Sequence, residues 1–242
     1  MSGQASKNYI LQVMIILSEM RNKKTISLII PTKNEEGNLQ KVLDTIPKFI
    51  DEILIVDGYS EDKTVEIAKQ NNCKVYFDKG AKGSAVRLGV KKAKGDYMIM
   101  MDADCSMRPI EFGLMLEALD AGYDFCLGSR FLQGGGTDDM TWYRKLGNKL
   151  FVFIVNKLWK MNYSDLCYGY RSFRREAFAK LDLKSNDFSI ETEMSIKIAK
   201  KRLKAVEVPS FEKSRFSGKG NLRTIRDGWR ISKRIIYEMV HK

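Results

Sequence analysis

The sequence predicts an α/β protein built on a mostly parallel, doubly wound sheet. Between residues 25 and 130, short apolar runs alternate with stretches of helical periodicity. No internal repeat or low-complexity linker interrupts the chain of 242 residues, which is long enough for one sizeable core. Ligands of such sheets bind beyond the carboxyl ends of the strands, so function is expected at those ends.

The first elements are a strand, a helix and a second strand. The β-branched run TISLIIPT at residues 25–32 ends at proline and predicts a buried strand. Residues 34–46 (NEEGNLQKVLDTI) carry acidic residues in the first turn and apolar residues at helical spacing. DEILIVD at 51–57 predicts the second strand, and Ser60 is placed to cap a helix that runs through Ala68.

The alternation then continues to Arg130. CKVYFD (73–78) predicts a third strand, and GAKGSAVRLGVKKAKG (80–95) predicts a loop followed by a helix. YMIMMDAD (97–104) predicts the fourth strand, residues 110–119 a helix, and DFCLGSR (124–130) the fifth strand.

After the fifth strand the pattern changes. LQGGGTDDM (132–140) predicts a hinge or lid, and residues 144–161 predict a helix with a large apolar share. Two segments, LCYGYRSFRREAF (166–178) and KAVEVPSFE (204–212), predict strands or turns around a helix at 193–200.

Composition excludes several classes of site. The only histidine is His241, which removes histidine triads, imidazole bases and histidine metal cages. The four cysteines show no C-x-x-C spacing and predict reduced thiols. A net charge of +12 predicts attraction to nucleic acid, an anionic membrane or phosphorylated substrates. Because the basic residues form no stripe with stacking aromatics, nucleic acid is not expected as a partner.

No segment reaches the length of about 20 apolar residues that spanning a bilayer requires. YILQVMIILSEM (9–20) predicts a docked or interfacial helix, or a poorly ordered extension. On a helical wheel the tail gathers Ile225, Trp229, Ile231, Ile235, Ile236, Met239 and Val240 within about half the circumference, with basic residues opposite. Such a helix suits a membrane interface, and the alternative is a helix that docks on the domain with its basic face in solvent.

Chemistry is indicated most clearly by YMIMMDADCSMRP at 97–109, where a buried strand breaks into Asp102 and Asp104. Two neighbouring carboxylates repel unless a cation lies between them. Carboxylate oxygens suit Mg²⁺ or Mn²⁺, which would also hold a diphosphate; an ordinary polar strand end is the alternative. Asp57 in IVDGYSEDKT is placed to meet a base or ribose, or simply to cap a turn. Neither a Walker A loop nor a G-x-G-x-x-G motif is present. The basic side chains of Lys79, Lys82 and Arg87 are therefore expected either to face a phosphate outside such a motif or to be solvated loop charges.

An ordered set of segments carries a resemblance: IIPTKNEEGNL, IVDGYSEDKT, KGSAVRLG, DYMIMMDAD, LGSRF, YGYRSFRREAF, IETEMSIKIAKKRLKAVEVP and RFSGKGNL. Over residues 25–229 the chain resembles family 2 glycosyltransferases of GT-A fold, and among them dolichyl-phosphate mannose synthases and related polyprenyl-phosphate glycosyltransferases. The resemblance implies a GT-A domain at 25–222 with a C-terminal acceptor-side elaboration. The flanking residues predict an N-terminal extension at 1–24, helical or poorly ordered, and a basic amphipathic helix at 223–242.

The resemblance also implies roles for individual residues. The nucleotide-binding residues would be Pro31, Thr32, Asn34, Glu35, Asp57, Lys82 and Asp102, and the metal ligands Asp102 and Asp104. Ser106 stands where mannose synthases often carry glutamine. The acceptor-binding residues would be Arg130, Arg171, Glu193 and Arg215, and the catalytic residues Asp104, Arg130, Arg215 and Asp165.

The implied reaction is an inverting transfer of hexose from GDP-mannose or UDP-glucose to a polyprenyl or dolichyl phosphate, with Mg²⁺ or Mn²⁺. The expected location is cytoplasmic, peripheral on the inner face of the cell membrane, with a membrane-protein partner as a further expectation. The alternative is transfer to a hydroxyl of a growing glycan, with Asp165, Glu191 or Glu193 as general base.

Overall fold

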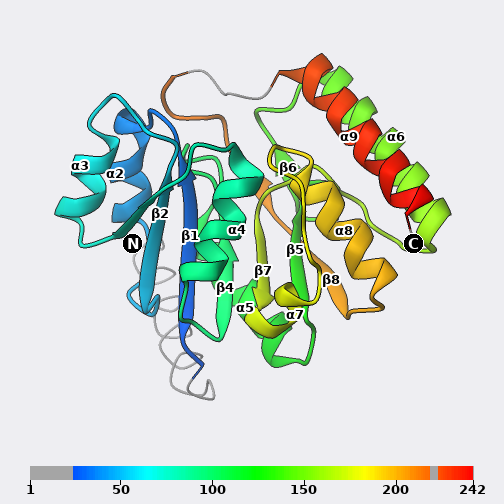
Figure 1. Cartoon of the computed structure of the whole chain (residues 1–242), viewed down its shortest axis with the longest axis horizontal. Coiled ribbons are helices and arrows are strands. Elements are labelled where there is room, and N and C mark those ends of the chain that lie inside the picture. The colour runs from blue at the N-terminus through cyan, green and yellow to red at the C-terminus, as the bar shows by residue number, and fades with distance from the viewer. Residues whose placement is uncertain (1–23, 219–222, 242) are drawn as a thin grey trace, which may run out of the picture.

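The computed structural model describes residues 24–218 and 223–241, and its centre is a seven-stranded sheet of order β3-β2-β1-β4-β7-β5-β8 (Figure 1). All neighbouring strands are parallel except β7, which runs antiparallel to both β4 and β5. The mostly parallel sheet expected from the sequence is therefore confirmed. The strands are β1 (Ile26–Thr32), β2 (Glu52–Asp57), β3 (Lys74–Phe77), β4 (Tyr97–Met100), β5 (Phe125–Ser129), β7 (Arg171–Arg174) and β8 (Ala205–Pro209).

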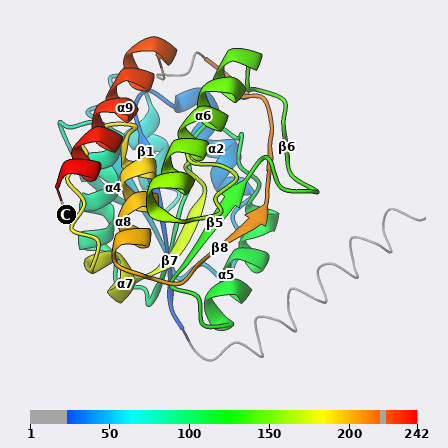
Figure 2. The same cartoon turned by 90° about the vertical axis from the view of Figure 1, so that its right-hand side faces the viewer.

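Helices cover both faces of this sheet (Figures 1 and 2). They are α2 (Glu36–Asp44), α3 (Thr64–Gln70), α4 (Lys82–Lys92), α5 (Phe112–Asp120), α6 (Trp142–Trp159), α7 (Arg175–Ala179), α8 (Ile190–Lys200) and α9 (Thr224–Val240), with a 3₁₀ turn η1 at Pro109–Glu111. Alternate residues of β1 enter opposite cores: Ile29 packs with α4 and α8, whereas Leu28 and Ile30 pack with α2 and α5. Burial on both faces is the reason for the continuous apolar runs of the inner strands.

Several local predictions differ from the structure. The predicted hinge at 132–140 contains β6 (Gly136–Thr137), which pairs with β9 (Phe211–Glu212) in a small second sheet. The predicted helix at 193–200 begins earlier, at Ile190. Ser60 does not cap α3: its hydroxyl and amide both donate to Asp57, and Asp62 accepts from the Thr64 amide instead.

The last helix docks on the domain, packing against α8 and α6. Ile231 and Ile235 are buried in this contact, while Ile225, Trp229 and Ile236 stay exposed. The apolar half-circle predicted for the tail is thus split between a docked face and an exposed one. The predicted extension at 1–24 lies outside the described residues except for Lys24, and so do residues 219–222 of the predicted domain. Among the helices of the described part, none is long and apolar enough to cross a membrane.

Candidate active site

The carboxyl ends of β1, β2 and β4 lie together at one edge of the sheet. Thr32 and Asp57 pair in register at the ends of β1 and β2, and β4 ends two residues before Asp102. Because parallel strands all present their carboxyl ends at the same edge, side chains from three separate segments meet there.

Each member of the acidic pair has its own basic partner. Asp102 Oδ1 lies 2.6 Å from Lys82 Nζ, and Asp104 Oδ2 lies 3.3 Å from an Arg215 guanidinium nitrogen. The two carboxylate side chains remain 32% and 19% exposed, respectively, so they line the surface of the site. Burial raises the pKa of Asp102, and the Asp104 charge adds to this while Lys82 opposes it. The positive charges of Lys82 and Arg215 offset the repulsion that the sequence predicts between these two aspartates.

Lys82 is the first residue of α4 and bridges two acidic groups from different elements. Its ammonium also lies 2.9 Å from Glu191 Oε1, on α8. Burial by itself lowers the pKa of Lys82, but the charges of Asp102 and Glu191 outweigh it and raise that pKa. A Cβ atom at Gly169 would stand 2.5 Å from the Lys82 nitrogen, so the ammonium occupies space that only glycine leaves open.

Arg215 ties the returning C-terminal segment to the acidic edge. Its guanidinium donates to both carboxylate oxygens of Glu35 and to the Ser217 carbonyl, the latter at 2.7 Å. Asn38 donates to Glu35 at 2.7 Å, and the Phe216 amide donates to the Asp104 carbonyl. Burial lowers the pKa of Arg215, but Glu35 and Asp104 raise it more. The predicted residues Glu35, Asp104 and Arg215 are therefore brought into one cluster.

The predicted nucleotide residues after β1 and β2 form a tight pair of turns. Asp57 is fully buried and accepts hydrogen bonds from the Thr32 hydroxyl at 2.8 Å and from the Ser60 amide at 2.7 Å. Asn34 has a φ of 55° and accepts from the Glu61 amide at 2.9 Å, while half-buried Pro31 directly precedes Thr32. Asp57 holds the two turns together in this structure, and its contact with a base or ribose stays a prediction.

A second ionic network lies at the end of β5. Arg130 makes a two-point contact with Asp165 at 2.7 and 2.9 Å and reaches Glu212 at 3.1 Å. Its guanidinium carbon also lies 4.5 Å from the centre of the Tyr168 ring. Every side-chain nitrogen of Arg130 is thus engaged within the protein. Glu212 was missed in the sequence because its segment is distant from GSR and carries no motif of its own. Tyr168 begins the motif YGYRSFRREAF, but nothing in that motif indicates a contact with Arg130.

The remaining acceptor-side candidates are buried and satisfied by the protein. Arg171 donates to the Tyr168 and Leu166 carbonyls and to the Ser195 hydroxyl, and burial lowers its pKa. Glu193 accepts from the amides of Lys184 and Ser185. Burial would raise the pKa of Glu193, but these amides lower it overall. Both residues support the surrounding loops, and their predicted contacts with an acceptor stay predictions.

The acidic pair fits a divalent cation that is held partly by these two carboxylates and partly by the phosphates of a substrate. Among residues 24–218 and 223–241, no three His, Cys, Asp or Glu side chains are arranged to hold a metal by themselves. Mg²⁺ is commonly held by one or two carboxylates together with substrate phosphates. Asp102 and Asp104 supply that number of carboxylates, and Ser106, whose amide donates to Asp104 at 3.0 Å, holds the second one in place.

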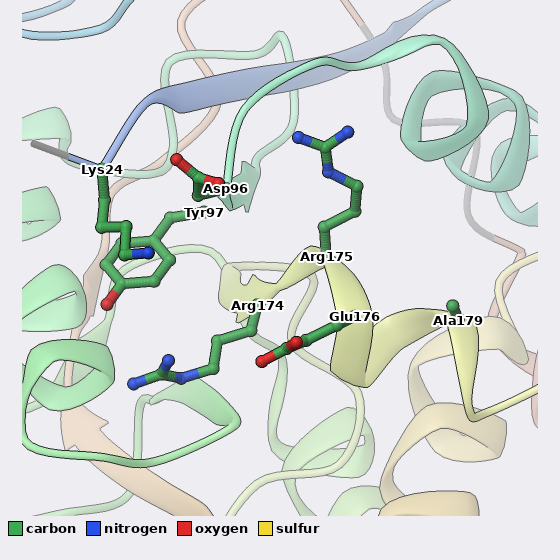
Figure 3. Close-up of a pocket in the computed structure, with 7 residues that line it drawn as sticks. All are labelled: Lys24, Asp96, Tyr97, Arg174, Arg175, Glu176 and Ala179. Atoms are coloured by element: carbon green, nitrogen blue, oxygen red, sulfur yellow. The ribbon is translucent and has the colours of Figure 1, made fainter.

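A separate pocket lies at the opposite, amino end of β4 (Figure 3). Its basic groups are already occupied by the protein: Arg174 donates to the carbonyls of Tyr123 and Leu119, and Arg175 donates to the Lys94 carbonyl. The pocket is lined by Lys24, Asp96, Tyr97, Arg174, Arg175, Glu176 and Ala179. None of these is a predicted site residue, and the acidic edge remains the better candidate because it gathers charges from several strand ends.

Comparison with solved structures supports the architecture. A crystal structure of glucosyl-3-phosphoglycerate synthase from Mycobacterium tuberculosis superposes with a TM-score of 0.72 at 18% identity, covering 93% of this chain and 83% of the other. A second structure of that enzyme, with Mn²⁺, UDP and glucosyl-3-phosphoglycerate, gives a TM-score of 0.70 at 18% identity, covering 93% and 81% of the two chains. At this level of identity the likeness establishes the fold, which is GT-A.

Comparison with curated sequences establishes the family. The chain is 34% identical over 222 residues to glycosyltransferase AglJ of Haloferax volcanii, covering 86% of this chain and 70% of that protein. It is 32% identical to a dolichol-phosphate mannosyltransferase of Pyrococcus furiosus, covering 82% of this chain but 59% of the longer relative. It is 30% identical to polyprenol monophosphomannose synthase of Mycolicibacterium smegmatis, covering 75% of each. The profile described as Glycosyl transferase family 2 matches residues 27–182, and the chain belongs to that family.

Proposed function

We propose that the protein transfers a hexose, with inversion, from a nucleotide sugar to a polyprenyl phosphate at a membrane surface. The observation that carries this proposal is the acidic pair with its two basic partners at the carboxyl edge of the sheet. The names of two relatives, a dolichol-phosphate mannosyltransferase and a polyprenol monophosphomannose synthase, support a lipid phosphate as acceptor. The UDP complexes of the structural neighbours support a nucleotide sugar as donor.

The chemistry requires charge placement more than a strong base. A phosphate monoester has a second pKa of about 6 and is largely a dianion at neutral pH. One of its oxygens forms a bond to the anomeric carbon of the sugar. The bond from that carbon to the nucleoside diphosphate breaks, and its electron pair leaves on the diphosphate. The rate then depends on holding the attacking phosphate in line and on neutralising the departing group.

The residues of the acidic edge match these two requirements. Asp102 and Asp104 would hold Mg²⁺ or Mn²⁺, which neutralises charge on the diphosphate when bound. Arg215, now paired with Glu35 and Asp104, presents a forked cation that suits a phosphate group. Lys82 offers a second cation beside Asp102. Lys82 and Arg215 each pair with two carboxylates, so each can replace one of them by a phosphate oxygen and still have its positive charge balanced.

The alternative acceptor, a glycan hydroxyl, needs a free carboxylate base, and the three candidates are engaged. Asp165 is paired with Arg130, and Glu191 with Lys82. Glu193 accepts from two backbone amides and lies 3.0 Å from the ammonium of Lys197. Because each of these carboxylates is already the partner of a cation, these contacts favour the phosphate acceptor.

The direct test is an assay with a panel of donors. The protein would be incubated with GDP-mannose or UDP-glucose, Mn²⁺ and a short polyprenyl phosphate, and lipid-linked sugar would be measured. We expect lipid product with one donor and no product when the metal is chelated. Label found only on added glycan hydroxyls would favour the alternative acceptor, and consumption of no donor would refute the proposal.

Membrane attachment is proposed through the exposed faces of α6 and α9, which pack side by side (Figure 2). The exposed apolar side chains include Trp142, Leu146, Leu150 and Phe153 on α6, and Ile225, Trp229, Ile236 and Val240 on α9. Lys233 lies over the Trp229 ring, so basic and aromatic groups occur together. Such a surface suits the interface of an anionic bilayer, and the cytosolic leaflet, which is anionic, is the proposed face. A membrane-protein partner could share this surface.

Replacing Trp142 and Trp229 together by serine should weaken binding to vesicles of mixed anionic and zwitterionic phospholipid about tenfold, because two interfacial anchors are lost. Co-sedimentation with the vesicles measures the change. Leu114→Ser is the matched control, since Leu114 is exposed on α5 at the other face of the sheet. Equal vesicle binding by the double variant and the control would refute attachment through α6 and α9.

A further inference from the structure

Lys82 stands at an electrostatically unfavourable place for a cation. It is the first residue of α4, and the first turn of this helix contains no acidic residue. Helix N-termini carry partial positive charge and favour anions, so a lysine there needs compensation from elsewhere. Asp102 and Glu191 supply it, at 2.6 and 2.9 Å.

The ion pair with Lys82 accounts for only one of the two buried carboxylate oxygens of Glu191. Its side chain is 3% exposed, and Oε1 contacts the ammonium. Its other oxygen, Oε2, is buried and has no hydrogen-bond partner among the described residues. An unpartnered carboxylate oxygen is costly to bury, so a purely structural role would be expected to satisfy both oxygens.

The space around the ammonium is kept open by Gly169, which lies two residues before Arg171, the first residue of β7. A Cβ atom there would lie 2.5 Å from Lys82 Nζ, 3.2 Å from Glu191 and 3.5 Å from Asp102. All three charged groups therefore meet over one glycine. The ammonium, at the end of a flexible side chain, is the group that could move.

We propose that Lys82 is a resident counter-ion of Asp102, and that Glu191 is a positioning residue that retains the ammonium when Asp102 turns to a divalent cation. This inference rests on the proposed function. Before metal binds, the ion pair with Lys82 holds the Asp102 side chain in place. Once Asp102 serves the metal, the ammonium stays tethered by Glu191 beside the α4 N-terminus, where it binds the donor diphosphate.

The experiment compares binding of the metal with binding of the nucleotide, so it does not depend on turnover. Free Mn²⁺ is titrated by electron paramagnetic resonance without nucleotide, and UDP and GDP are titrated by calorimetry at saturating Mn²⁺. For Lys82→Met we expect Mn²⁺ to bind about tenfold more tightly, because its competitor for Asp102 is gone. The preferred nucleotide should bind about tenfold more weakly, because a cation is lost.

Two further variants separate this inference from a structural role. Gly169→Ala should displace the ammonium while keeping its charge, so Mn²⁺ alone binds more tightly, as in Lys82→Met. Glu191→Gln should weaken nucleotide binding in the native background but not in the Lys82→Met background. Loss of a negative charge by itself would strengthen nucleotide binding, so weakening indicates action through Lys82.

Lys197→Met is the matched control, since Lys197 pairs with Glu193 on the same helix but away from the acidic pair. Unchanged Mn²⁺ affinity in both Lys82→Met and Gly169→Ala would overturn the inference while leaving the proposed function intact. Failure of the native protein to bind Mn²⁺ with either nucleotide would overturn both.

Discussion

Replacing Asp104 by asparagine should reduce sugar transfer at least about 10³-fold. The substitution removes one of the two carboxylates proposed to hold the divalent cation and leaves Arg215 paired with Glu35 alone. The departing diphosphate then loses stabilisation of its developing charge, so the rate of the chemical step falls. Initial rates at saturating donor and acceptor, measured with a range of Mn²⁺ concentrations, test this prediction.

The matched control is Asp182→Asn. Asp182 is an exposed aspartate in a surface ion pair with Lys184, and its φ of 47° is one that asparagine tolerates. Its replacement should leave the rate unchanged. Transfer by the Asp104 variant within about threefold of the native rate would contradict the assignment of the acidic pair to the metal.

Replacing Asp165 by asparagine should lower the free energy of unfolding by about 3 kcal/mol. Asp165 is fully buried and forms a two-point contact with Arg130, which would keep only Glu212 as a charged partner. Breaking a buried ion pair on one side leaves a charge in a poorly solvated place, which costs more than the pair contributed. Urea unfolding followed by circular dichroism measures the loss.

The same experiment decides what the network at the end of β5 does. Asp182→Asn, which breaks the exposed pair with Lys184, should change the free energy of unfolding by less than about 1 kcal/mol. If Asp165→Asn were equally stable but failed to use the lipid phosphate, Arg130 and Asp165 would belong to the acceptor site as the family resemblance implies. Large destabilisation with a retained affinity for acceptor would assign the pair to the scaffold.

The sequence was sufficient for the mostly parallel sheet and for the place of the acidic pair at its carboxyl edge, because these depend on local patterns. The inner strands carry continuous apolar stretches, LII at residues 28–30 and YMIMM at residues 97–101, since both faces of these strands are covered by helices. Because β4 ends two residues before Asp102, that carboxylate lies at the carboxyl edge of the sheet, where ligands of such sheets bind. The ordered motifs also identified the family, whose profile matches residues 27–182.

Local signals were ambiguous where one residue type serves several purposes. Serine is a common residue at helix N-caps, yet Ser60 donates hydrogen bonds to Asp57 across a turn instead. The glycines at 134–136 read as a hinge, yet Gly136 begins a short strand paired with Phe211. The tail has one apolar half-circle, and only the packing against α8 shows which part of it is buried.

By itself, then, the sequence determined the α/β class, the family and the acidic pair, since each depends on short local motifs and on their order along the chain. Only the tertiary structure decided which charges compensate that pair. Lys82, Asp102 and Glu191 come from three different elements, and Arg215 returns to Glu35 across most of the chain. Such pairings depend on the crossover of β7 between β4 and β5 and on the space left by Gly169. Charge compensation acts over a few ångströms in space, whatever the separation along the chain.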